Sequence, residues 1–286
     1  MSDNICIKGL TKQFKGFALQ DVTFSVPRGA VVGFIGENGA GKSTTIKSIL
    51  GLVRPESGSI EVFGKDVGAL TKEERGRLGT VLGDGSLPEN LTAKDMDAVL
   101  RHIFVHWDSS AFYGYIDRFS LPNDKKIKEF SRGMRQKFAL AVALSHGADV
   151  LVLDAPTAGL DPVARDEILD ILYAFMQDER RAVLISSHIV SDLEKLCDYI
   201  AFIHQGKLIL FDEKDALYEK YAVMRASLER LRDYKDAVVA LHRGEFGAGA
   251  LVLRAKLPAD VPTERAGIED IMLYFVRGEK LRRDCF

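Results

Sequence analysis

One segment constrains the fold of this chain more than any other. An apolar run at 31–35 leads into the glycine-rich stretch GENGAGKS at 36–43, and the pattern after it predicts a helix over Lys42–Leu50. The stretch fits the spacing G-x-x-x-x-G-K-S, in which glycines let backbone N–H groups approach phosphate oxygens and the helix N-terminus adds positive potential. The segment therefore predicts a buried strand, a phosphate-binding loop and a helix, which together form a nucleotide site.

The loop supplies specific candidates for contacts to a nucleotide. In loops of this spacing the lysine reaches the β- and γ-phosphates and the next hydroxyl binds Mg²⁺, so we expect these roles for Lys42 and Ser43. Thr44 is placed to donate to an α-phosphate oxygen. A glycine-rich turn without a ligand is the alternative, but strand, loop and helix all agree with a nucleotide site. The expected nucleotide-binding residues of the loop are Gly36, Asn38, Gly39, Ala40, Gly41, Lys42, Ser43 and Thr44.

A second motif supplies a carboxylate for the metal. Val150–Leu153 is an apolar strand that ends in Asp154, the arrangement in which a carboxylate at a strand end points into the magnesium shell. Four aliphatic residues before an aspartate are a weak signal alone. Combined with the phosphate loop and the following PTAGLDP at 156–162, the signal is strong. We therefore expect Ser43 and Asp154 to bind Mg²⁺.

Composition and charge exclude several classes of function. The net charge of −2 gives no general attraction to nucleic acid or anionic lipid, so we expect no nucleic-acid partner. The three cysteines are scattered without a metal or disulfide spacing, which favours a reducing cytoplasm. The N-terminus lacks a basic region followed by an apolar stretch, so we expect no signal peptide. Apolar runs such as Ile200–Ile203 are far shorter than the roughly 20 residues that cross a bilayer, so we expect no membrane span.

The chain predicts an α/β fold followed by a smaller domain. Strand patterns alternate with helical patterns, including helices over Thr92–Phe119 and from Ser131 to about His146, which implies a largely parallel sheet covered on both faces. Beyond Asp212 the character changes to a charged segment that looks helical over Tyr218–Leu241, then a strand-like segment and a last helix at Ile268–Val276. We expect a nucleotide-binding domain at 1–212 and an α+β accessory domain at 213–286.

A third motif lies between the first two. The segment FSRGMRQ at 130–136 resembles the LSGGQ signature of ABC transporter ATP-binding subunits, with Ser131 and Gly133 aligned and with Arg132 and Met134 as departures. This variation resembles bacterial exporter-type (ABC-2-like) subunits, which pair with separate membrane proteins. A plain helix N-cap is the alternative for the serine, but the spacing between the other two motifs favours the signature.

The resemblance implies a fold and a dimer. It spans about residues 5–211 and implies the P-loop NTPase fold of ABC ATPases, with a mixed, largely parallel core sheet, an antiparallel N-terminal subdomain and a helical subdomain at about 86–146. In this family Ser131 and Gly133 would meet ATP held by the opposite subunit. The segment 158–161, with Asp161, would lie at the interface, so a homodimer or a pair with another ATPase subunit is expected.

Three further residues are identified through the resemblance. His188 follows a predicted strand and matches the switch histidine that contacts the γ-phosphate. Phe14 falls where the family stacks an aromatic ring on adenine, although a core phenylalanine is the alternative. The glutamine of the Q-loop is missing, and the segment around Gly83 offers Asp84 as its replacement. Residues 86–107 lie where the membrane partner docks, or they make ordinary packing contacts.

One departure concerns catalysis. Active members carry glutamate directly after the strand-end aspartate, where it orients the attacking water, but this chain has Ala155. Losing a general base typically costs about 10²–10⁴ in rate, so we expect impaired hydrolysis, with His188 and Asp84 as the other candidate catalytic groups. Three explanations stay open: a substitution that traps the ATP state, a naturally inactive subunit, or a family that uses another base.

The function that follows is the ATP-binding subunit of an ABC transporter. It would bind MgATP at a dimer interface and couple binding and hydrolysis to export by separate permease subunits, at the inner face of the cell membrane. The alternative is an ABC-type regulatory module that binds ATP without turnover. Soluble ABC proteins of translation or repair usually carry two ATPase units or a long coiled-coil insertion, which this chain lacks. A kinase or GTPase would not need the signature.

Overall fold

The computed structural model describes residues 3–83, 87–244 and 247–279. The chain divides into two compact units, one ending at Leu208 and the other beginning at Ile209. The division falls within a strand, a few residues before the expected domain boundary at 212. Within the described ranges, every helix is too short or too polar to cross a lipid bilayer.

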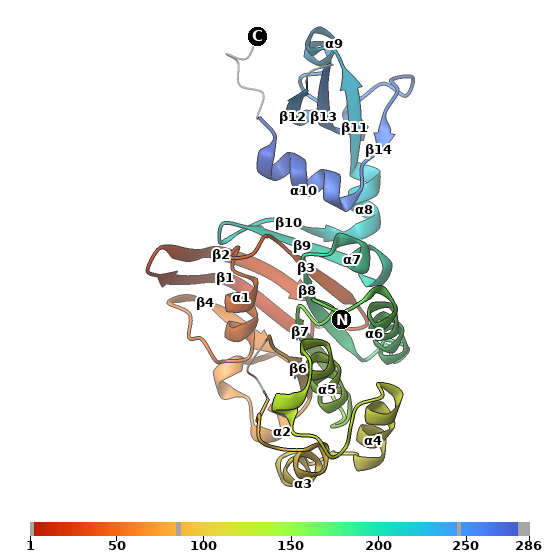
Figure 1. Ribbon diagram of the computed structural model, residues 1–286. Coiled ribbons are helices and arrows are strands. Elements are labelled where there is room, and N and C mark those ends of the chain that lie inside the picture. The colour runs from red at the N-terminus through yellow and green to blue at the C-terminus, as the bar shows by residue number, and fades with distance from the viewer. Residues whose placement is uncertain (1–2, 84–86, 245–246, 280–286) are drawn as a thin grey trace. The chain divides into compact units, whose positions relative to one another are not determined.

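The first unit is built on a six-stranded sheet with strand order β10-β9-β3-β8-β7-β6 (Figure 1). β3 is parallel to β8 and β9, and β7 is parallel to β8 and β6. Every residue of β3 is buried, as expected for a strand covered on both faces. The strands are β3 (Val31–Ile35), β6 (Leu78–Val81), β7 (Val150–Asp154), β8 (Ala182–Ser187), β9 (Tyr199–His204) and β10 (Lys207–Glu213).

A second sheet, with order β2-β1-β4-β5, forms the antiparallel N-terminal part of this unit. β1 and β2 form a hairpin that closes where Phe14 pairs with Phe17. The helix α1 contacts both β7 of the first sheet and β4 of the second, so it joins the two sheets. The elements are β1 (Ile5–Phe14), β2 (Phe17–Val26), β4 (Ser57–Val62), β5 (Lys65–Asp66) and α1 (Lys42–Ile49).

The helical part of the first unit contains the helices expected from the sequence, with one interruption. The helical pattern expected over Thr92–Phe119 is confirmed as two helices, which are separated at 104–108. Asp108 caps the second, since its carboxylate accepts from the Ala111 N–H at 2.9 Å. The helices of this unit are α2 (Lys72–Arg75), α3 (Ala93–Ile103), α4 (Ser109–Arg118), α5 (Arg132–Leu144), α6 (Pro162–Phe175) and α7 (Val190–Leu196), with short 3₁₀ turns at Val67–Ala69 and Ile127–Glu129.

The second unit is an α+β arrangement around a four-stranded sheet with order β12-β13-β11-β14. The helix expected over Tyr218–Leu241 is wrong, because two strands and one short helix occupy most of that range. Ala222 and Met224 alternate with residues of the other face and join a buried core with Leu231. The elements are α8 (Lys214–Lys220), β11 (Tyr221–Ala226), α9 (Leu228–Asp233), β12 (Val238–Gly244), β13 (Gly247–Leu253), a 3₁₀ turn at Arg254–Lys256, β14 (Glu264–Arg265) and α10 (Ile268–Arg277).

Candidate functional site

Three strands of the first unit end side by side. β3 leads into the glycine-rich loop, β7 ends at Asp154, and β8 is followed by His188. In the parallel register Ile35 lies opposite Ser187, while Asp154 lies opposite Ser186. The phosphate loop, the carboxylate and the histidine therefore emerge from the same edge of the sheet, the edge where open α/β sheets bind ligands.

Two glycines of the loop occupy positions that a side chain would not fit. A Cβ on Gly36 would lie 2.4 Å from the Ile203 carbonyl oxygen. Gly41 has φ of +114°, and a Cβ there would lie 2.5 Å from Leu19 Cδ2. The loop is thus pressed against neighbouring elements, and its backbone follows a path that glycine favours. Asn38 and Gly39 are exposed at the loop tip, whereas Ala40 is buried.

Lys42 bridges the loop from the start of α1. Its ammonium donates to the carbonyl oxygens of Gly36 at 2.6 Å and Glu37 at 3.0 Å. Burial lowers the pKa of Lys42, and the nearby Asp154 and Glu37 carboxylates oppose that shift. Because these two hydrogen bonds go to neutral carbonyl oxygens, the half-buried ammonium can exchange them for bonds to phosphate, a stronger acceptor. Ser43, the next residue, is exposed.

The carboxylate at the end of β7 is held by a neighbour that the sequence did not single out as a site residue. Ser186 Oγ donates to Asp154 Oδ1 at 2.6 Å, and Ser186 is fully buried. Asp154 and the exposed Ser43 offer hard oxygen donors of the kind Mg²⁺ prefers, with phosphates and waters completing the shell. Among residues 3–83, 87–244 and 247–279, no group of three His, Cys, Asp or Glu could form an all-protein cage. The donor set fits magnesium shared with a nucleotide.

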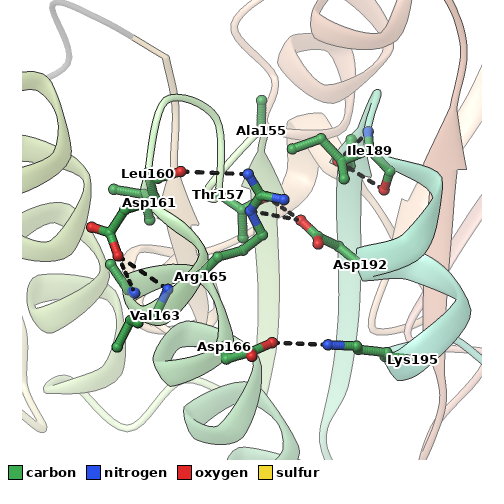
Figure 2. A network of polar contacts seen from close by, with 12 residues as sticks. Ala155, Thr157, Leu160, Asp161, Val163, Arg165, Asp166, Ile189, Asp192 and Lys195 are labelled. Atoms are coloured by element: carbon green, nitrogen blue, oxygen red, sulfur yellow. Dashed lines mark hydrogen bonds and ion pairs between the residues drawn. The ribbon is translucent and has the colours of Figure 1, made fainter.

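Ala155 has a backbone conformation that is unusual for its type. Its φ is +51°, in the left-handed region that L-residues with a Cβ rarely occupy. The N–H donates to the Ser186 carbonyl oxygen at 3.1 Å and to Ser186 Oγ at 3.0 Å. The carbonyl oxygen accepts from Gln136 Nε2 at 3.1 Å. The side chain is a methyl group without a proton acceptor, and Figure 2 shows it pointing away from the polar network beneath it.

The signature segment and the segment 158–161 lie against each other. A Cβ on Gly133 would lie 2.9 Å from Leu160 Cδ2, so a larger residue would push the two segments apart. Ser131 caps α5 by accepting from the Met134 N–H at 3.2 Å, and it remains exposed. Asp161 caps α6, and the backbone N–H groups that it accepts from lower its pKa. Both candidate interface residues thus start helices at the surface of the first unit.

A buried polar network holds the loop after β7 (Figure 2). Thr157 Oγ1 donates to Asp192 Oδ2 at 2.9 Å, and both residues are buried. Arg165 Nε lies 3.8 Å from the same carboxylate, an ion pair without a hydrogen bond, while Arg165 Nη2 donates to the Leu160 carbonyl oxygen at 3.4 Å. The Asp192 carboxylate therefore ties the start of α7 to the loop between Ala155 and α6.

We expect the Asp192→Ala variant to lose about 2–3 kcal/mol of unfolding free energy, because it leaves the buried Thr157 hydroxyl without its acceptor and Arg165 without the carboxylate of its ion pair. The matched control is Asp166→Ala, since the Asp166–Lys195 ion pair of the same network is more than 60% exposed on both sides and should contribute less than about 1 kcal/mol. Urea denaturation measures both. Equal losses in the two variants would contradict this reading.

The remaining candidates are placed as follows. Phe14 ends β1 and is 40% exposed, so it is not a core residue; its ring centroid lies 6.4 Å from that of Phe17. His188 is exposed directly after β8, and Thr44 is half-buried in the first turn of α1. Asp84, the candidate for the missing glutamine, lies outside the described residues.

Comparisons with known proteins agree with this arrangement. A sequence profile of the ABC transporter family matches residues 19–158. The chain is 34% identical over 249 residues to the bacitracin transport ATP-binding protein BcrA of Bacillus licheniformis, covering 85% of this chain and 80% of that protein. It is 38% identical over 213 residues to the lantibiotic transport ATP-binding protein SrtF of Streptococcus pyogenes, covering 73% of this chain and 90% of that protein.

The solved structures agree on the fold. The structure of an ATP-binding subunit of an ABC transporter superposes with a TM-score of 0.67 and 28% identity, covering 74% of this chain and 91% of that one. The predicted P-loop NTPase fold, with its largely parallel core sheet and antiparallel N-terminal sheet, is confirmed. The chain belongs to the ABC transporter family, as one of its ATP-binding subunits.

Proposed function

We propose that this chain binds MgATP at the loop 36–44 and couples ATP binding and hydrolysis to export through separate membrane-spanning subunits. The observation that carries the proposal is the meeting of Lys42, Asp154 and His188 at one edge of the parallel sheet. A phosphate chain along this edge would meet the loop N–H groups and the lysine, with the histidine beyond its terminal phosphate.

Each residue has a role that its position supports. Lys42 exchanges the loop carbonyls for the β- and γ-phosphates. Ser43 and Asp154 bind Mg²⁺, which when bound neutralises phosphate charge, and Ser186 keeps the carboxylate turned toward it. The other loop candidates, Gly36, Asn38, Gly39, Ala40, Gly41 and Thr44, surround the phosphates. The exposed ring of Phe14 is available to stack on the adenine.

The site is completed by a second ATP-binding subunit, identical or paired. Ser131 and Gly133 at the start of α5 would contact the ATP of that subunit, with Asp161 beside them. Ser131 supports this by its exposure at a helix start, where N–H groups can meet an anion. Gly133 is half-buried and lies against the segment 158–161 at Leu160.

Hydrolysis is proposed to be slow in this chain. Ala155 occupies the position of the general base, and its methyl group cannot accept a proton. His188, exposed directly after β8, is then our candidate for the polar group that acts near the terminal phosphate. Asp84 is the further candidate. The same alanine favours the second function considered, a regulatory module that holds ATP without turnover.

The wider setting is inferred from the relatives. Since BcrA and SrtF are named for transport of bacitracin and of a lantibiotic, we propose a peptide antibiotic as the exported substrate and a location at the inner face of the cell membrane. The permease would supply the membrane spans. Residues 1–212 form the ATP-binding domain, and 213–286 form an accessory domain.

Titration calorimetry tests the metal site. We expect ATP to bind the native chain more tightly with Mg²⁺ than with EDTA, because Asp154 and Ser43 share the ion with the phosphates. The Asp154→Asn variant should lose most of the Mg²⁺ dependence, whereas Asp166→Asn, an exposed carboxylate on α6, should keep it. ATP binding that is indifferent to Mg²⁺ in the native chain would rule out this metal site.

A further inference from the structure

The backbone at position 155 is held on both sides by side chains from other elements. Ser186 of β8 accepts the Ala155 N–H, and Gln136 of α5 donates to the Ala155 carbonyl oxygen. Between these two contacts the residue keeps φ at +51°. The Ser186 carbonyl oxygen also accepts the Ala155 N–H, and the Ala158 N–H also donates to the Ala155 carbonyl oxygen at 3.2 Å. Because the direction of a Cβ follows from the backbone on either side of it, the two side-chain contacts act with these backbone bonds to set where the side chain at position 155 points.

The Gln136 side chain makes this contact at a cost, because only one of its two polar atoms has a hydrogen-bond partner in the described part of the chain. A carbonyl oxygen can only accept, so the amide NH₂ must face Ala155 and the amide oxygen must face the other way. That oxygen, Gln136 Oε1, is buried and has no hydrogen-bond partner among the described residues. A buried acceptor without a donor is unfavourable for folding. A methionine of similar length would avoid this penalty, so stability does not account for the glutamine.

We propose that Gln136 is a positioning residue for the side chain at position 155. It lies one turn inside the helix that begins after Ser131, so the hydrogen bond joins the signature helix directly to the end of β7. A carboxylate at position 155 would depend on this bond for its aim at the attacking water. This inference rests on the proposed function, in which position 155 is that of the general base.

The first test uses the native sequence and does not require activity. Amide hydrogen exchange of Ala155, followed by NMR, should become at least about 10-fold faster in Gln136→Met, because the Ala155 carbonyl then keeps, among the described residues, only its bond from the Ala158 N–H and the backbone around position 155 is held less firmly. Gln177→Met is the matched control, since Gln177 Nε2 also donates to a backbone carbonyl, that of Tyr173, at 3.3 Å. It should leave Ala155 unchanged. Unchanged exchange in Gln136→Met would overturn the proposal.

The second test adds each change to the Ala155→Glu variant and measures MgATP hydrolysis. Gln136→Met should lower kcat about 10-fold or more, because a misdirected catalytic group loses rate steeply, with KM for ATP changed less than about 2-fold because the phosphate contacts remain. Gln177→Met should alter neither. A normal kcat would overturn the proposal. If the Ala155→Glu variant itself does not hydrolyse ATP, the assignment of the base fails, and the exchange measurement still decides whether Gln136 positions residue 155.

Discussion

Replacing Ala155 by glutamate is expected to raise the rate of MgATP hydrolysis by about 10²–10⁴, the range that a positioned general base contributes. The backbone at this position is already clamped by Ser186 and Gln136, so the new side chain inherits a fixed direction. The Asp154 carboxylate and Lys42 are unchanged, and nucleotide affinity should stay similar. Phosphate release from the purified chain measures the rate.

The control for this prediction is Ala155→Gln, which adds a side chain of the same size without a proton acceptor of comparable strength. It should remain near the rate of the native chain. If the native chain already turns over as fast as the Ala155→Glu variant, the base has been assigned wrongly, and His188 and Asp84 become the candidates. If neither form hydrolyses while both bind ATP, the regulatory module is the better description.

Replacing Lys42 by alanine is expected to weaken MgATP binding by about 10- to 100-fold, which corresponds to the loss of hydrogen bonds between a charged donor and phosphate. The ammonium is already positioned across the loop by the Gly36 and Glu37 carbonyl oxygens. The native chain therefore loses little side-chain entropy when Lys42 binds phosphate. Equilibrium titration with a fluorescent ATP analogue measures the change.

Lys47→Ala is the matched control for this variant. Lys47 lies on the same helix, α1, but is exposed near its C-terminal end, one and a half turns away from the loop. Its removal should leave MgATP affinity within about 2-fold, because an exposed charge at that distance is screened by salt. Equal losses in both variants would mean that Lys42 acts through general positive charge and not through contact with phosphate.

The parts of the site that the sequence predicted are those carried by local chemistry. The strand, glycine loop and helix around Lys42 are contiguous in the sequence. Close contacts with neighbouring elements explain why positions 36 and 41 require glycine. The aspartate at the end of β7 also follows from one short segment. Each of these motifs combines a residue pattern with a turn or strand end that the same residues determine.

The parts that were missed depend on contacts between distant segments. Ser186 donates to a carboxylate 32 residues before it, and Gln136 donates to a carbonyl 19 residues after it. The Gln136 contact leaves no pattern in the sequence, whereas a small hydroxyl residue at the end of a strand beside β7 was a usable signal for Ser186. The left-handed backbone at Ala155 was equally hidden, since alanine gives no sign of positive φ.

In the second unit, the spacing of charged and apolar residues predicted a helix where the structure has mainly strands. Charged residues spaced through 218–241 indicated one helix, but the apolar residues of β11 alternate between the two faces of a sheet that forms only when β13 pairs with it. Pairing partners 22 to 32 residues apart decide the structure there, and tertiary packing overrides local propensity.

We propose that this chain holds MgATP between two ATP-binding subunits without efficient hydrolysis. The most direct measurement is to incubate the native chain with MgATP, isolate it by size-exclusion chromatography, and identify the bound nucleotide. We expect a dimer that retains intact ATP, and a monomer when MgADP is used. Recovery of bound ADP at the rate of an active ATPase, or of a nucleotide-free monomer, would contradict it.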